Sequence, residues 1–175
     1  MQLELKRIQH ELGTTFVYVT HDQEEALAIS DRVIVMNVGV IDQIGTPEEI
    51  YNRPRSRFVA DFVGSANLLR GKMSGRDIFE AEGGVTLRVI SPHVPTGRET
   101  EVAVRTAYID LEPRADENQV PGTVRQRMFH GDFVQYIVEC AAGRLIVRRP
   151  PVNLLDEGAP VTVSFSPEHT VLLQG

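Results

Sequence analysis

The sequence holds a single cysteine and few aromatic residues, and its acidic side chains outnumber its basic ones. Cys140 has no second cysteine to pair with, which excludes an internal disulfide and fits a reducing compartment. Aromatic residues make up only 6% of the chain, and the net charge is −6 at pH 7. A mildly acidic chain with few rings to stack on bases is a poor candidate for binding nucleic acid or an anionic membrane.

The sequence also lacks a membrane-spanning run, a phosphate-binding motif and histidines at metal-ligand spacing. No apolar run approaches the roughly 20 residues that cross a bilayer, and the N-terminus lacks the basic start and apolar core of a signal peptide. We therefore expect a cytoplasmic protein without direct membrane insertion. No G-x-x-x-x-G-K-[ST] motif occurs, so the sequence provides no P-loop to hold phosphates. His93, His130 and His169 lack metal-ligand spacing, and we expect no metal site.

The chemical information that is present is concentrated near the N-terminus. Residues 16–19 form a short apolar run of β-branched and aromatic residues, which predicts a strand covered on both faces. Asp22, followed three residues later by Glu25, is a capping-box pattern and predicts that a helix begins there. Residues 33–36 are a second run of this kind, which predicts a second buried strand. The order strand, helix, strand predicts a right-handed parallel crossover.

His21 lies between the predicted strand and the predicted helix. The carboxyl end of a parallel strand is where open α/β sheets bind their ligands. An imidazole at that place can donate to a phosphate oxygen or orient a water molecule. In an arbitrary sequence, however, a lone histidine at a strand end is more often a solvated or satisfied core residue. The residues around His21 must therefore decide between the two interpretations.

For the rest of the first 64 residues the sequence predicts helices and one hairpin. Helical spacing of apolar residues, N-cap residues and turn residues predict them. The predicted elements are a helix over residues 2–12, a hairpin of residues 33–36 with 40–44, a short helix after Thr46 and a helix over residues 58–63. Gly64-Ser65 closes the last helix, and we place a domain boundary there, between domains 1–64 and 65–175.

Beyond Ala66 the apolar pattern changes to short runs that are broken by glycine, proline and aspartate. Many short strands with turn signals between them predict an antiparallel barrel or sandwich. The longest predicted loop covers residues 91–100. The predicted strands are residues 67–73, 78–81, 85–89, 101–105, 119–129, 133–140, 144–148, 160–165 and 170–173.

Ordered motifs in both halves resemble one family. The motifs THDQEEA (residues 20–26), SDRV (30–33) and GTPEEIY (45–51) resemble the end of the ATPase subunit of ATP-binding cassette importers of the sugar, polyamine and ferric-iron type. This match runs without a gap from about residue 3 to residue 64. In the second half, GTV (122–124), GD (131–132), YIV (136–138), GRL (143–145) and VTV (161–163) resemble the transport-associated OB (TOBE) domain that follows many such ATPases.

The resemblance implies an α+β protein. Residues 1–64 would be the C-terminal remnant of a RecA-like α/β nucleotide-binding domain, and residues 65–175 an all-β, OB-like TOBE barrel. By position, His21 would be the family's switch histidine, which reaches the γ-phosphate of ATP. It is our candidate catalytic and nucleotide-binding residue. The full-length subunit would use ATP and Mg²⁺, pair as a homodimer and drive permease subunits at the cytoplasmic face of the inner membrane.

The chain also departs from the family pattern. The P-loop, the signature sequence and the acidic strand end for magnesium lie upstream in the family, so we expect Met1 to be a truncation point. The chain as given should bind no cofactor and hydrolyse no ATP. Where family members carry Arg-Pro-Glu, Arg105 is followed by Thr106-Ala107, so a role attached to that glutamate does not carry over.

Two alternatives belong to other functional classes. The barrel could sense a small ligand such as an oxyanion, or it could bind oligonucleotides, although that function needs exposed aromatics on a basic face. Arg144, Arg148 and Arg149 could hold an anion, but strand alternation favours a solvated face for Arg144 and Arg148. We also expect residues 1–45 to expose apolar surface and the chain to self-associate, most simply as a two-fold dimer.

Overall fold

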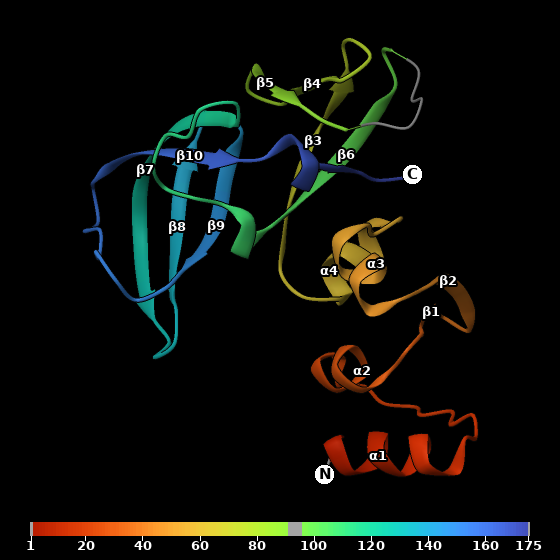
Figure 1. The fold of residues 1–175 in the computed structure, drawn as a ribbon. Helices are drawn as coiled ribbons and strands as arrows, with labels where there is room; N and C mark the ends of the chain where they lie inside the picture. Colours follow the sequence, from red (N-terminus) through yellow and green to blue (C-terminus); the bar gives the residue numbers. More distant parts are fainter. Residues whose placement is uncertain (1, 91–95, 175) are drawn as a thin grey trace. The chain divides into compact units, whose positions relative to one another are not determined.

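The structure is a computed structural model that describes residues 2–90 and 96–174. The chain divides into two compact units, residues 1–64 and 65–175, each of which has its own hydrophobic core (Figure 1). In the part of the chain that is described, no helix has the length and apolar character to span a membrane. The predicted loop over residues 91–100 lies partly outside the described residues.

The first unit contains four helices and one hairpin in the described residues. They are α1 (Gln2–Leu12), α2 (Gln23–Ile29), β1 (Val33–Asn37), β2 (Val40–Gly45), α3 (Pro47–Asn52) and α4 (Arg57–Phe62). These elements confirm the predicted helices and the predicted hairpin. Side-chain caps begin three of the helices, because Asp22, Thr46 and Ser56 each accept a hydrogen bond from a backbone N–H in the first turn.

The predicted strand over residues 16–19 is wrong. Residues 14–20 have no strand structure, and Val17 and Val19 are 88% and 89% exposed. β1 pairs only with β2, and the pairing is antiparallel, so the described residues contain no parallel crossover. The physical reason is that a strand exists only when a neighbour completes its hydrogen bonds, and none of the described strands lies beside this run.

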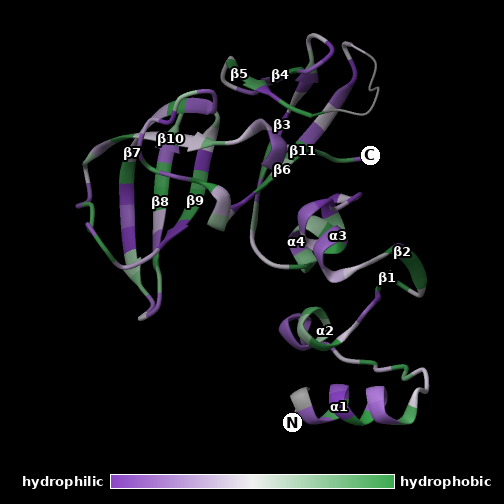
Figure 2. Ribbon diagram, viewed as in Figure 1, coloured by the Kyte–Doolittle hydropathy of each residue, from purple (hydrophilic) through white to green (hydrophobic). Residues whose placement is uncertain are grey.

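The hairpin is buried on one side only, which also corrects the prediction of a second fully covered strand. Val33 and Val35 are buried and share a small core with Ile50, Val59 and Val63. The alternate positions, Ile34 and Met36, are more than half exposed. In Figure 2 the hairpin is coloured as hydrophobic although one of its faces has no cover among the described residues.

The second unit is a β structure made of two sheets, and the paired strands within each sheet run antiparallel. Its strands are β3 (Ala66–Met73), β4 (Ile78–Ala81), β5 (Val85–Arg88), β6 (Glu99–Arg105), β7 (Asn118–Phe129), β8 (Val134–Cys140), β9 (Gly143–Arg149), β10 (Pro160–Phe165) and β11 (Val171–Leu172), with short 3-10 helices η1 (Thr106–Tyr108) and η2 (Pro167–His169). One sheet has the order β10-β7-β8-β9 and the other β11-β6-β3-β4-β5. Both contribute to a single core, which confirms the predicted strands and the barrel-like arrangement.

Two buried asparagines join the sheets of the second unit. Asn67 of β3 donates to the carbonyl of Ile146 in β9 at 2.8 Å and accepts from the N–H of the same residue at 2.7 Å. Asn118 of β7 makes the equivalent pair of bonds with Arg88 of β5, at 2.9 and 2.7 Å. Each carboxamide thus replaces a missing strand neighbour, because it offers a donor and an acceptor side by side.

A glycine in the β4–β5 turn brings the two sheets close at another point. Gly83 has a φ of 83°, and a Cβ at this position would lie 1.8 Å from the backbone carbonyl oxygen of Ala141 in the β8–β9 turn. Only a residue without a side chain fits such an approach. The next residue, Gly84, has a similar φ of 78° but faces open space.

Candidate functional site

His21 lies in the turn that joins the extended residues 14–20 to α2, and its side chain is exposed. The turn is set by Asp22, the N-cap of α2, whose carboxylate accepts from the backbone N–H of Glu25 at 3.0 Å. This bond satisfies one of the backbone donors that a helix start leaves free. The predicted helix start is therefore confirmed, although the element before His21 is not the predicted strand.

The carboxylate of Glu25 turns back toward the residues before His21. It accepts from the hydroxyl of Tyr18 at 2.9 Å and from that of Thr20 at 3.4 Å. The Thr20 hydroxyl in turn accepts from the backbone N–H of Asp22 at 2.9 Å. Both chain neighbours of His21 are thus tied to the first turn of α2, while the imidazole itself remains exposed.

The Tyr18–Glu25 bond also affects titration. The pKa of Tyr18 lies above its ordinary value, first because its hydroxyl donates to the Glu25 carboxylate and then because the negative charge of Glu25 disfavours a phenolate nearby. The phenol therefore remains a hydrogen-bond donor throughout the neutral range.

In chemical terms the site offers one exposed imidazole on a fixed turn. An imidazole can donate a hydrogen bond or exchange a proton near neutral pH. No group of three histidine, cysteine, aspartate or glutamate side chains that could hold a metal ion exists within the described ranges. The chemistry that this turn offers is that of the exposed histidine.

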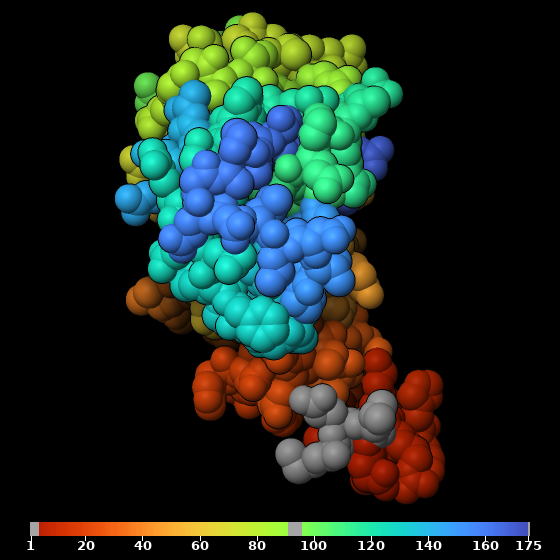
Figure 3. Space-filling model, turned by 90° about the vertical axis from the view of Figure 1, so that its left-hand side faces the viewer, coloured from red at the N-terminus to blue at the C-terminus, as the bar shows by residue number. Residues whose placement is uncertain are grey.

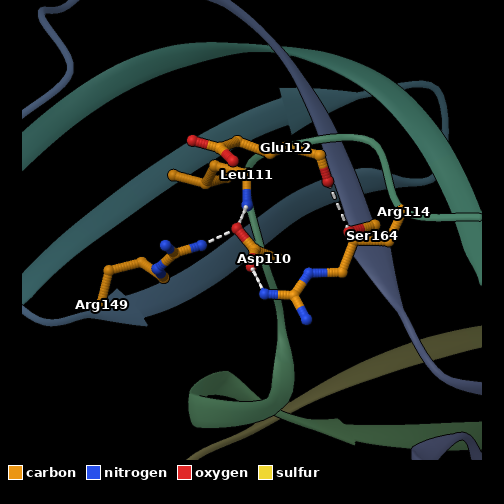
Figure 4. Close-up of polar contacts among 6 residues, drawn as sticks. All are labelled: Asp110, Leu111, Glu112, Arg114, Arg149 and Ser164. Carbon is orange, nitrogen blue, oxygen red and sulfur yellow. Dashed lines mark hydrogen bonds and ion pairs between the residues drawn. The ribbon is translucent and has the colours of Figure 1, made fainter. Parts of the chain in front are cut away.

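The second unit has a polar centre that sequence reasoning missed. Asp110, which is 9% exposed, forms ion pairs with both Arg149 and Arg114, and one of its oxygens accepts from the N–H of Leu111 at 2.7 Å (Figure 4). Ser164 of β10 donates its hydroxyl to the carbonyl of Glu112 at 2.7 Å. These contacts tie the segment after η1 to β9 and β10. No motif in the sequence signals a pairing between residues this far apart.

The remaining histidines and arginines have structural partners or are solvated. His130 stacks on Phe133 with a centroid distance of 4.6 Å, and Arg148 lies over the same ring at 4.8 Å. His169 stacks on Tyr108 at 4.2 Å. Arg149 is engaged by Asp110 and Arg144 is exposed, so the anion-binding alternative gains no support. His93 lies outside the described residues.

Comparison with known proteins gives a family. A model of the TOBE domain matches residues 102–173. The whole chain also aligns with the spermidine/putrescine import ATP-binding protein PotA of Rubrobacter xylanophilus at 39% identity and with that of Thermobifida fusca at 41% identity, in each case covering 100% of this chain and 49% of the relative. This chain belongs to the ATP-binding subunits of ATP-binding cassette importers. It represents their C-terminal part and includes their TOBE domain.

This subunit segment spans about half the length of the curated relatives that it matches. A third relative, the PotA protein of Acetivibrio thermocellus, is 48% identical over 75% of this chain and 37% of its own length. Because the alignments with the first two relatives cover both units, the family assignment does not depend on the TOBE domain alone.

A solved structure supports the fold of the second unit. The cytoplasmic molybdate-binding protein ModG aligns with 62% of this chain and 96% of its own chain, with a TM-score of 0.57 and 15% sequence identity. At that identity the likeness concerns the fold alone. It supports the OB-like arrangement of the two sheets, and it does not extend to ligand binding.

Proposed function

We propose that the whole subunit couples ATP hydrolysis to the uptake of a polyamine such as spermidine or putrescine. The observation that carries this proposal is the alignment of the entire chain, at 39 to 41% identity, with two proteins whose names state spermidine/putrescine import. Solute selection belongs to other subunits in such a transporter, so the identity of the solute follows from the relatives and not from any pocket in this chain.

Within that function, residues 1–64 would be the last part of a RecA-like nucleotide-binding domain, and His21 its switch histidine. Two observations support the role of His21. The THDQEEA motif places it immediately before the N-cap of α2, and the imidazole is exposed on a turn whose flanking residues are tied down. In this role His21 donates to a phosphate oxygen or orients the attacking water, which stabilises the transition state for phosphoryl transfer.

Binding of ATP itself would depend mainly on residues that this chain does not contain. A P-loop offers several backbone donors and a lysine, whereas His21 offers a single contact. We therefore expect the chain alone to bind ATP no better than millimolar, as isothermal calorimetry would show.

The TOBE barrel would serve dimerisation or regulation of the subunit. Its partners would be a second copy of the subunit and the permease subunits, which would hold it at the cytoplasmic face of the inner membrane. The barrel's core and its two asparagine junctions support this role by providing a rigid body that can transmit or resist movement. Sensing of a small ligand or binding of oligonucleotides remain alternatives without a specific contact in their favour.

The experiment is transport by the complete subunit with its permease in proteoliposomes. ATP-driven uptake should be saturable for radiolabelled spermidine or putrescine and unaffected by maltose or ferric ion. His21→Ala should lower turnover about 100-fold while ATP affinity changes little, since a group that acts in the transition state contributes little to ground-state binding. His10→Ala, an exposed histidine on α1, is the matched control. Uptake of a sugar instead, or normal turnover in His21→Ala, would refute the corresponding part of the proposal.

A further inference from the structure

We propose that Glu25 is a positioning residue for His21 and that it acts through the hydroxyl of Thr20. The inference deepens the proposed function, because it assigns a role to residues that would support the histidine without touching the nucleotide. It rests on the hydrogen-bond geometry on both sides of His21 and on a comparison between two helix starts in the same chain.

The comparison is with α3, where a simple capping box forms. Thr46 accepts from the N–H of Glu49 at 3.2 Å, and the carboxylate of Glu49 reaches back to the N–H of Thr46 at 2.9 Å. Both partners bond each other directly, as the sequence spacing predicts. The helix start is then closed within its own residues, and the Glu49 carboxylate is used at the N-cap itself.

At α2 the same spacing gives a different result. Asp22 accepts from the N–H of Glu25 at 3.0 Å, but the Glu25 carboxylate does not bond the N–H of Asp22 in return. The N–H of Asp22 instead donates to the Thr20 hydroxyl at 2.9 Å. The neutral hydroxyl of Thr20 takes this position, because a hydroxyl can accept and donate at once.

The result is a relay of four groups on the two sides of His21. The N–H of Asp22 donates to the Thr20 hydroxyl, which donates to Glu25, and Tyr18 donates to the same carboxylate. The backbone is therefore fixed one residue before and one residue after the histidine. Since none of these bonds involves the imidazole, the relay can hold the position of His21 and leave its ring free to meet a ligand.

The first test is hydrogen exchange in this chain, followed by NMR. The Asp22 amide should be protected in the parent chain and in Thr20→Ser, which keeps the hydroxyl. Thr20→Val has nearly the same size but lacks the hydroxyl, and it should exchange about tenfold faster, in line with the loss of one hydrogen bond worth about 1.4 kcal/mol. Glu25→Ala should act similarly. Glu24→Ala, one position earlier and exposed, is the control that should change nothing. Equal exchange in Thr20→Val and the parent would overturn the relay.

The second test measures turnover in the complete subunit. Thr20→Val and Glu25→Ala should lower kcat about tenfold and leave the KM for ATP within about twofold, because misplacing a catalytic group affects the transition state more than binding. Glu25→Gln, which keeps an acceptor oxygen, and Thr20→Ser should recover most of the loss. Wild-type kcat in Glu25→Ala, together with a large loss in His21→Ala, would overturn the positioning role. If His21→Ala itself turns over normally, the proposed function fails, and the exchange experiment still decides whether the relay exists.

Discussion

The two units of the chain must both bury apolar surface, and they achieve it to very different degrees. Among the described residues, the core of the second unit contains twenty buried side chains and that of the first unit only five. Most of the exposed large apolar side chains lie in the first unit, which is the smaller of the two. The second unit therefore has the character of an independent domain, whereas the first has apolar faces that only another surface can cover.

Self-association is the largest effect that this difference predicts. The exposed residues 16–19 and the uncovered side of the β1–β2 hairpin should make the chain dimerise at micromolar concentration, because a soluble monomer rarely exposes so large an apolar patch. Light scattering on the chain and on a version that starts at Ser65 measures this. Loss of the dimer only in the shortened chain identifies the first unit as the contact. If the full chain is monomeric, the prediction that the apolar surface of the first unit causes self-association is wrong.

The next effect concerns the asparagine junctions of the second unit. Asn67→Leu keeps the volume but leaves the N–H and the carbonyl of Ile146 without their partner, and each unsatisfied buried group costs about 1 to 3 kcal/mol. We expect a loss of about 2 to 4 kcal/mol in the free energy of unfolding, measured by urea denaturation of the chain from Ser65 onward. Asn118→Leu should cost at least as much, since its amide also donates to the Thr170 hydroxyl. Unchanged stability in both variants would mean that the asparagine hydrogen bonds between the two sheets do not stabilise the second unit.

A smaller effect separates two adjacent glycines. Gly83→Ala and Gly84→Ala both place a side chain at positive φ, but only the first meets a backbone atom. Both should lose about 1 kcal/mol from the left-handed backbone, and Gly83→Ala a further 1 to 2 kcal/mol from the displacement of Ala141. The difference between their unfolding free energies is the measurement. Equal losses would show that the two turns can move apart at no cost.

The smallest expected effect is a gain in the stability of the β1–β2 hairpin of the first unit. Val38 and Gly39 form the turn of the β1–β2 hairpin with φ values of 48° and 78°. A β-branched residue is strained at positive φ, whereas Asn-Gly is the preferred pair for such a turn. Val38→Asn should therefore stabilise the hairpin by about 0.5 to 1 kcal/mol, seen as slower hydrogen exchange of the β1 and β2 amides. Val40→Asn, within β2, is the control and should not stabilise it.

The sequence allowed most of the fold to be predicted where structure depends on neighbouring residues. Short apolar runs between turn residues located the strands of the barrel, and the N-cap residues Asp22 and Thr46 begin helices where the sequence places helix starts. Residues 16–19 have the composition of a buried strand, yet they form none. Composition reports that a segment can be a strand, whereas hydrogen-bonding partners decide whether it is one.

The candidate site was also predictable only where it depends on residues that are neighbours in the sequence. His21 could be singled out because its motif is contiguous in the sequence. The relay through Thr20 could not, because the capping-box spacing predicts a bond from the Asp22 N–H to Glu25, whereas that N–H bonds the Thr20 hydroxyl. The Asp110 centre joins residues from β9 and from the segment after η1, and the pattern of a single strand carries no sign of such a pairing.

The loop that follows β9 shows how distant segments complete the barrel surface. In Figure 3 it lies beside the end of β7, and Arg127 of β7 bonds the carbonyl of Leu155 and the carboxylate of Asp156. The Tyr136 hydroxyl of β8 also accepts from the N–H of Leu155 at 3.2 Å. A long segment without regular structure is thereby held by side chains of the sheet.

The Asn67 junction also has a consequence for synthesis on the ribosome. Asn67 stands at the beginning of the second unit, and its partner Ile146 is made 79 residues later. At roughly 5 to 20 residues per second, β3 must wait about 4 to 16 seconds before the strand that it closes against exists. Until then its apolar face, and those of β4 and β5, are open to wrong pairings. Chaperones that cover these faces within this interval would therefore favour correct closure of the barrel.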